Sequence, residues 1–289
     1  MENELRGSLL IISAMLIYSF IGVFSRFAGI NVFALVFYKM VLASFFFFFI
    51  FLFARKRVGR LKMNWEMAKF FIPYGFVVAV TELTFIGAYL NTTMVNTIFL
   101  GALTPVFVAL LSFFFLKERV NLMTLFSIVI GITGVSFIVG ADLFVMLNEK
   151  NLFGDALAVV YALAYAVFTI YSRERAKRNI DIYYAVFWSY AIAAFLVLPF
   201  NFAYGTFIIP LESVIWIVLL AFICTNIAFI LFCKGFEYID APKGSVIALA
   251  EQLFVTINAL LFFGEGLGGL TLMGAALVCM SVILTQMKR

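Results

Sequence analysis

The sequence predicts an all-α integral membrane protein with ten transmembrane helices arranged as two inverted five-helix repeats. The composition is 65% hydrophobic and only 12% charged, whereas a soluble domain is about half apolar and about one quarter charged. The apolar residues form runs of about twenty residues, which is the length of a helix that crosses a bilayer. No run has the alternating polarity of a β-barrel strand. We therefore expect the chain to be embedded in a lipid bilayer.

Ten apolar runs follow one another along the chain, and each is long enough for a membrane-spanning helix. The fourth run ends at the charged triplet 117–119 and contains Pro105, which neighbouring helices can accommodate inside a membrane. Most connections are only a few residues long, so we expect consecutive helices to be antiparallel neighbours. The predicted spans are 7–27, 32–54, 68–90, 95–116, 120–140, 152–172, 183–203, 212–236, 242–263 and 267–287.

The chain is similar to itself at a shift of 147 residues. Pro105 precedes Glu118 by the same distance that separates Gln252 from Glu265. Because each copy has an odd number of spans, the second copy is predicted to enter the membrane in the opposite sense, a common construction of secondary transporters. Further aligned pairs are Gly7 with Gly154, Tyr18 with Tyr165 and Arg26 with Arg173. The predicted repeats are residues 1–147 and 148–289.

The basic residues predict the orientation of the chain. Every Lys and Arg outside the spans, except Lys150, lies on the same side of the membrane as the N-terminus. Cytoplasmic loops carry such an excess, so we expect a multi-pass protein of the cytoplasmic (inner) membrane with both termini in the cytoplasm. The first span lacks a small-residue cleavage site, so no removable signal peptide is expected.

Several classes of function are disfavoured. The net charge of +5 does not indicate nucleic-acid binding, because the basic residues lie in short loops between apolar runs. Cys224, Cys233 and Cys279 lie within apolar runs without a CxxC pair, and we interpret them as small hydrophobic residues. The chain has no histidine, which excludes HExxH zinc chemistry and histidine proton relays. We predict no metal and no cofactor.

Three charged residues lie deep within predicted spans, where a charge is costly and faces protein or water. Glu251 lies near the middle of the ninth span, and we predict that it binds a cationic group of the substrate or a proton. The alternative is a structural carboxylate that is bonded to a hydroxyl or to an amide of a broken helix. Lys39 and Glu82 lie at similar depths and are predicted to form an ion pair. The alternative is that Lys39 binds a carboxylate of the substrate.

Weaker candidates accompany these charges. Asn226 is suited to bind a zwitterion and equally to lock two helices together. The tyrosines of spans one and six line a ligand site or serve as packing residues. Arg26 is a surface residue or a guard of the outer mouth, and Pro105 is a gating hinge or a packed kink. The remaining candidates are Tyr18, Tyr161, Tyr165 and Asn258, with Glu118 and Glu265 as helix caps or loop anchors, and Gly131, Gly134 and Gly274 as helix-packing residues.

The segment 103–140 has a proline near its start, a glutamate at the end of the first helix, and spaced glycines in the second. It resembles the EamA repeat of the drug/metabolite transporter superfamily. The second copy resembles the same unit, with Gln252 in place of Pro105, and a turn at 88–97 corresponds to the one from Gly235. The resemblance implies ten helices, a central cavity and an alternating-access cycle. Members move amino acids, amines, nucleotide-sugar-like metabolites and other small solutes.

These observations predict a secondary transporter that exports a small polar metabolite, such as an amino acid or a related solute. The alternatives are a carrier of amines, drugs or nucleotide-type metabolites and, as a different class, an intramembrane enzyme. The chain has no GxxxxGK[ST] loop and no motif around its buried carboxylates, which disfavours an ATPase and an enzyme. Proton coupling stays open. We expect a monomer, because the duplicated chain supplies both halves, with a dimer as the alternative.

Overall fold

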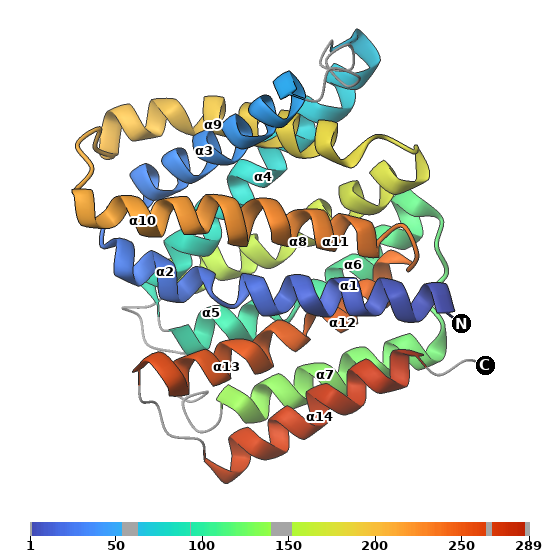
Figure 1. Ribbon diagram of the computed structural model, residues 1–289. Coiled ribbons are helices and arrows are strands. Elements are labelled where there is room, and N and C mark those ends of the chain that lie inside the picture. Colours follow the sequence, from blue (N-terminus) through green and yellow to red (C-terminus); the bar gives the residue numbers. More distant parts are fainter. Residues whose placement is uncertain (1, 54–62, 93, 140–151, 264–267, 287–289) are drawn as a thin grey trace.

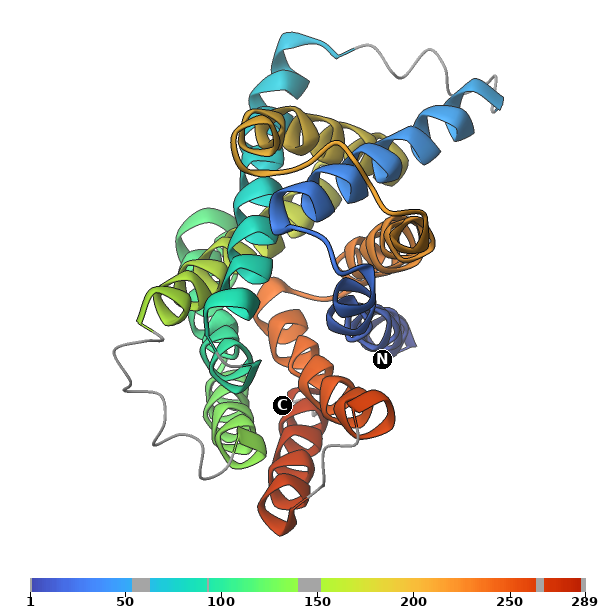
Figure 2. The ribbon, with the colours of Figure 1, turned by 90° about the vertical axis from the view of Figure 1, so that its left-hand side faces the viewer.

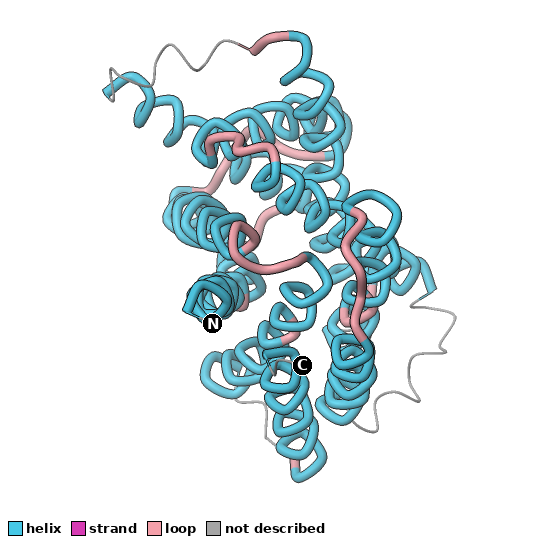
Figure 3. The backbone as a smooth tube through the Cα atoms, turned by 90° about the vertical axis from the view of Figure 1, so that its right-hand side faces the viewer, coloured by secondary structure: helices cyan, strands magenta, loops and turns pink. Residues whose placement is uncertain are grey.

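The structure is a computed structural model that describes residues 2–53, 63–92, 94–139, 152–263 and 268–286. These residues form helices joined by short turns, and no strand occurs among them (Figure 3). Within these ranges, nine helical segments are long and apolar enough to cross a membrane. The predicted span 120–140 corresponds to a shorter apolar helix, Leu122–Ile138. The all-α class is therefore confirmed.

The helices follow the predicted spans, but several spans contain more than one helix (Figure 1). The first half of the chain contains α1 (Glu2–Tyr18), α2 (Ile21–Ala28), α3 (Val32–Phe53), α4 (Trp65–Asn91), α5 (Met94–Gly101), α6 (Thr104–Leu111), the π-helix η2 (Ser112–Leu116) and α7 (Leu122–Val139). The second half contains α8 (Leu152–Lys177), α9 (Ile182–Tyr204), α10 (Leu211–Leu219), the π-helix η5 (Leu220–Ile227), α11 (Ala228–Gly235), α12 (Ala241–Ala248), α13 (Ala250–Phe263) and α14 (Gly269–Gln286).

Local sequence signals define several helix ends. The Asn64 side chain accepts a hydrogen bond from the Met67 amide at the start of α4, and Asp181 caps the start of α9 in the same way. Such caps satisfy amides that have no partner within the helix. Gly29 follows α2 with φ 60°, a left-handed conformation that glycine adopts without steric cost.

Two membrane segments are broken at positions that correspond under the repeat shift. In the first half, α5 ends before Ala102, whose amide bonds the Phe99 carbonyl three residues back, and Pro105 lies in the first turn of α6. In the second half, α12 gives way to α13 at Leu249, 147 positions after Ala102. Gln252 stands at the proline position there, so proline alone does not cause the break. Interrupted backbone inside a membrane is tolerated where it is buried in protein or lines a cavity.

Helices from the two halves pack against each other throughout the bundle. α1 packs on α11 and α4 packs on α8, while α3 pairs with α9 and α7 pairs with α14. Figures 1 and 2 show the α7–α14 pair along one edge of the bundle and the α3–α9 pair along the opposite edge. The start of α1 and the end of α14 lie at the same end of the bundle, which we call the terminal end (Figure 1). Ser8 and Gln286 are hydrogen-bonded there.

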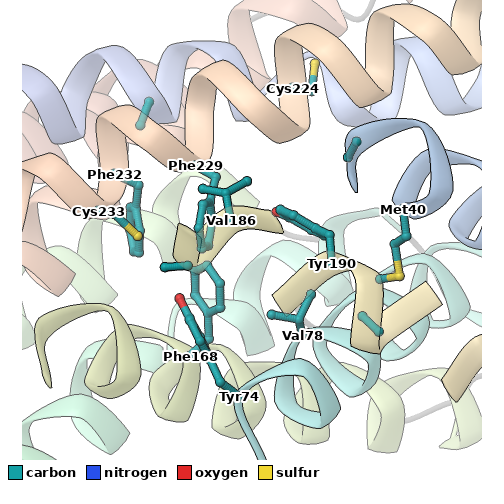
Figure 4. Packing of buried hydrophobic residues seen from close by; sticks show 14 of the residues in the cluster. Met40, Tyr74, Val78, Phe168, Val186, Tyr190, Cys224, Phe229, Phe232 and Cys233 are labelled. Carbon is teal, nitrogen blue, oxygen red and sulfur yellow. The ribbon is translucent and has the colours of Figure 1, made fainter. Parts of the chain in front are cut away.

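Aromatic side chains fill the core between α4, α8, α9 and α11. Figure 4 shows Tyr74, Phe168, Phe229 and Phe232 packed closely with aliphatic neighbours, and these four side chains are almost completely buried. The burial of such rings contributes most of the packing area in a core of this kind. Cys233 is buried in this core and Cys224 is buried beside Ile17 of α1, both as free thiols, whereas Cys279 is exposed on α14.

Glycines bring α7 and α14 into backbone contact. A Cβ atom on Gly134 would lie 2.8 Å from the Gly274 carbonyl oxygen, and one on Gly274 would collide with the same region of α7. Small residues allow such close approach between membrane helices. These glycines therefore serve packing inside one chain, which is the role that the sequence favoured.

Candidate functional site

Two small cavities lie side by side near the middle of the bundle, and both halves of the chain line each of them. The first, about 50 Å³, is walled by aromatic residues and we call it the tyrosine cavity. The second, about 30 Å³, lies at the two helix breaks and we call it the break cavity. Cavities of this size hold a few water molecules. They share Phe85, Tyr161, Tyr165 and Glu251 as lining residues.

Glu251 lies between the two cavities. It occupies the first turn of α13, directly after the break at Leu249, where the positive end of the helix dipole stabilises a negative charge. Within the part of the chain that the structure describes, its side chain forms no hydrogen bond and no ion pair. The structural alternative, a carboxylate bonded to a hydroxyl or a helix amide, therefore has no support among the described residues. Glu251 is thus an acidic side chain without a partner among the described residues, and it lines both cavities.

Aromatic rings surround this carboxylate. Tyr161, Tyr165 and Phe168 stack along one face of α8, with ring centroids 5.7 Å and 5.6 Å apart between neighbours. Tyr18 and Tyr190 complete the tyrosine cavity from α1 and α9. The Tyr165 hydroxyl is buried and has no hydrogen-bond partner among the described residues. The predicted tyrosines of spans one and six thus lie together with Glu251 around one cavity.

Lys39 and Glu82 form an ion pair. Lys39 Nζ on α3 donates to Glu82 Oε2 on α4 at 2.5 Å. The Lys39 side chain is 1% exposed and that of Glu82 is 17% exposed. Glu82 lines the tyrosine cavity, whereas Lys39 lines neither cavity. In this arrangement Lys39 neutralises Glu82, and its charge does not face the cavity.

The break cavity is more polar than the tyrosine cavity. Thr104 and Ser245 line it, and their hydroxyls donate to the Ala162 and Pro242 carbonyls. The Gln252 Oε1 atom is buried there without a partner among the described residues. An unpartnered acceptor in such a place is available to a hydrogen-bond donor of a ligand.

Four other predicted residues do not line the tyrosine cavity. Asn226 in η5 donates to the Ala43 carbonyl at 3.2 Å and lines neither cavity, which favours a lock between helices. Asn258 on α13 donates to Ser19 at the α1–α2 break. Arg26 is exposed near the end of α2, whereas Pro105 lines the break cavity.

A cluster of charges at the terminal end joins the two halves, and we call it the Arg173 clasp. Glu118, from the turn after η2, accepts hydrogen bonds from Arg173 Nε at 2.8 Å and from the Ala241 amide at 2.9 Å. Lys177 lies 3.0 Å from the same carboxylate. Arg173 also donates to the Phe236 carbonyl and to Asp240, both at 2.6 Å.

The clasp fixes Glu118 in its ionised form. Burial alone raises the pKa of this carboxyl, but the hydrogen bonds from Arg173 and the Ala241 amide outweigh it and hold the pKa below its usual value. The sequence predicted a cap or loop anchor at Glu118, and the structure agrees. It did not predict the part played by Arg173. The repeat alignment held the signal, since both copies keep an arginine and a glutamate at these places.

The apolar helices of this bundle define a multi-pass membrane protein. A family model for the EamA-like transporter family matches residues 5–140 and again residues 152–287. The chain therefore belongs to the EamA-like transporter family, within the drug/metabolite transporter superfamily. Because this is a family of transporters, membership favours transport over catalysis.

Individual relatives agree with this assignment. An uncharacterized transporter of Archaeoglobus fulgidus is 26% identical over 71% of this chain and 71% of its own length. The uncharacterized transporter YxxF of Bacillus subtilis is 24% identical over 96% of this chain and 88% of its own length. A solved crystal structure covers 97% of both chains with a TM-score of 0.81 at 16% identity, which supports the fold alone.

Proposed function

We propose that the protein is a secondary transporter that moves a small polar solute across the cytoplasmic membrane by alternating access. The observation that carries this proposal is the place of Glu251. It stands, without a partner among the described residues, at the start of a helix that begins again inside the membrane, between cavities lined by both halves. Binding sites at discontinuous helices between two halves are typical of secondary transporters.

The packing of the halves supports two inverted repeats, residues 1–147 and 148–289. Under the repeat shift α1 corresponds to the first part of α8, and the last part of α4 corresponds to α11. The α1–α11 contact therefore becomes the α8–α4 contact, and both are formed. The α3–α9 and α7–α14 pairs each join a helix to its own counterpart. This exchange is what a two-fold relation between the halves requires.

The Arg173 clasp supports a closed state of one access route. It joins the turn at Glu118 in the first half to the turn at Asp240 in the second. Ala241 and Glu251 lie ten residues apart, which is about 15 Å of helical rise. If the basic loops are cytoplasmic, the clasp closes the cytoplasmic route to the cavities and must open for the solute to pass.

The predicted solute is an amino acid or a related metabolite, carried in the direction of export. A carboxylate surrounded by aromatic rings fits a solute with a cationic group. Amines, drugs and nucleotide-type metabolites are the alternatives. Glu251 can instead bind a proton when no solute is present, which would couple transport to protons. A monomer contains both halves of this site.

The test is solute counterflow into proteoliposomes with a panel of amino acids, amines, nucleotides and sugar phosphates. We expect Glu251→Gln to lower the flux of the transported solute about tenfold or more, the usual effect of losing a hydrogen-bonded charge. Glu212→Gln, at an exposed glutamate on α10, is the matched control and should keep the wild-type flux. Wild-type flux in Glu251→Gln would remove this residue from the binding site.

A further inference from the structure

We infer that the solute is an organic cation without a carboxylate, that is, an amine, and that its cationic group binds in the tyrosine cavity beside Glu251. This inference rests on the proposed transport function and narrows its substrate class. The sequence predicted an amino acid, so the inference also replaces the first substrate class by one of its alternatives.

The charges that line the two cavities disfavour a solute with a carboxylate. The described residues that line the two cavities include two acidic side chains, Glu82 and Glu251, and no lysine or arginine. The nearby cation, Lys39, is 1% exposed and is bonded to Glu82. The carboxylate of an amino acid would therefore meet the unpaired carboxylate of Glu251 and no unpaired cation among the described lining residues. A buried charge without a partner is costly.

The helix breaks do not replace the missing cation. Helix N-termini bind anions through free amides. At the start of α13, however, the first turn already carries Glu251, and the Gln252 amide donates to the Leu249 carbonyl. At the start of α6, Pro105 has no N–H, and the Val106 amide donates to the Leu103 carbonyl. Both breaks are thus poor sites for a carboxylate.

The rings and the unpartnered atoms favour a cation. Tyr161, Tyr165 and Phe168 are stacked along α8 at the wall of the tyrosine cavity, and aromatic faces attract ammonium groups, most strongly when water is excluded. The buried unpartnered atoms at the cavities are the Tyr165 hydroxyl and Gln252 Oε1, and both can accept hydrogen bonds from an amine. Glu251 supplies the opposite charge.

Matched pairs of solutes test this inference, because an amino acid and its decarboxylated amine differ only in the carboxylate. The probes are phenylalanine with 2-phenylethylamine, tyrosine with tyramine, and leucine with isoamylamine. Binding is measured with the purified full chain by thermal shift and calorimetry. We expect the amines to bind about tenfold or more tightly than their parent amino acids, since the unpaired carboxylate is penalised.

Variants of the aromatic wall separate a cation site from a packing role. Tyr165→Leu should weaken amine binding by roughly 3- to 30-fold, whereas Tyr165→Phe, which keeps the ring and loses only the hydroxyl, should weaken it less than Tyr165→Leu does. Tyr204→Leu, at an exposed tyrosine at the end of α9, is the matched control. Equal losses in Tyr165→Leu and Tyr165→Phe would contradict the cation–π contribution.

Binding and flux distinguish the two proposals. Amine binding with amine counterflow supports both. Amine binding without flux of any solute keeps the amine site and overturns the transport function. Flux of amino acids that bind more tightly than their amines overturns the amine inference and keeps the transporter. If no amine of the panel binds, the inference is overturned.

Discussion

At the scale of single residues, the Lys39–Glu82 pair shows why the buried charges of this chain must be considered together. Lys39 is almost fully buried, and its ammonium bonds the Glu82 carboxylate at 2.5 Å. Removal of one partner from a buried pair leaves an uncompensated charge, which usually costs more than removal of both. The pair was predicted from matching depths in neighbouring spans, and the geometry agrees.

We therefore expect Lys39→Met alone to lower stability by about 3–5 kcal/mol, and Lys39→Met with Glu82→Leu to recover most of that loss. The measurement is the melting temperature of purified protein in one detergent, with expression level as a second readout. Lys69→Met is the control, because Lys69 is exposed at the start of α4. Equal melting temperatures for the single and double variants would show that the pair is not a structural unit.

At the scale of elements, the two broken helices set the position of the site. The break before α6 coincides with a proline, whereas the break before α13 occurs with Gln252 at the same repeat position. Proline near the start of a helix is well tolerated there and contributes little beyond its fixed φ. The second copy shows that this repeat position does not require proline for a break, so we expect packing between the halves to maintain the first break as well.

We expect the break before α6 to persist in Pro105→Ala. We expect a change in unfolding free energy of about 1 kcal/mol or less and a counterflow rate within about threefold of wild type. Melting temperature and flux are measured on the same preparation. A loss of flux above tenfold with unchanged melting temperature would instead support Pro105 as a gating hinge.

The Arg173 clasp is the element-scale feature with a defined pH dependence. Because the folded-state pKa of Glu118 is held below its usual value of 4.5, its contribution to stability is present above that value. It is lost as the pH falls through the lowered folded-state pKa. The melting-temperature difference between wild type and Glu118→Gln should thus be constant from about pH 6 to pH 8 and shrink below about pH 4.5. Glu212→Gln should show no such difference, and a difference that changes between pH 6 and pH 8 would contradict this role.

At the scale of the whole molecule, the sequence predicts the membrane segments better than the site. Apolar runs indicate helices because a bilayer imposes length and polarity on any spanning segment. A break such as the one at Leu249 leaves average hydropathy unchanged, so no run reveals it. Glu251 was predicted as a site residue because a charge in an apolar run is conspicuous, and it lines both cavities. Tyr190 and Gln252 were missed as lining residues because aromatic and amide side chains in a span are equally compatible with packing.

Asn226 is a predicted substrate-binding residue that does not line either cavity. It was a substrate-binding candidate because it is polar within an apolar run, yet its amide bonds the Ala43 carbonyl away from both cavities. Which way a side chain points depends on helix rotation, and the apolar pattern of a helix that is hydrophobic on all sides does not define that rotation.

Opposite insertion of the two repeats is the prediction on which the transport cycle depends. Asn31 and Arg178 are related by the repeat shift and both are exposed in turns or at a helix end, so inverted repeats place them on opposite faces of the membrane. In a variant with Cys224, Cys233 and Cys279 replaced by alanine, an impermeant maleimide should label Asn31→Cys in intact cells. It should label Arg178→Cys only after the membrane is permeabilised, because the basic loops are predicted to be cytoplasmic. Labelling of both positions from the same side would mean that the halves are parallel. The two helix breaks would then not meet from opposite sides, and a cavity that opens alternately to each face would have no structural basis.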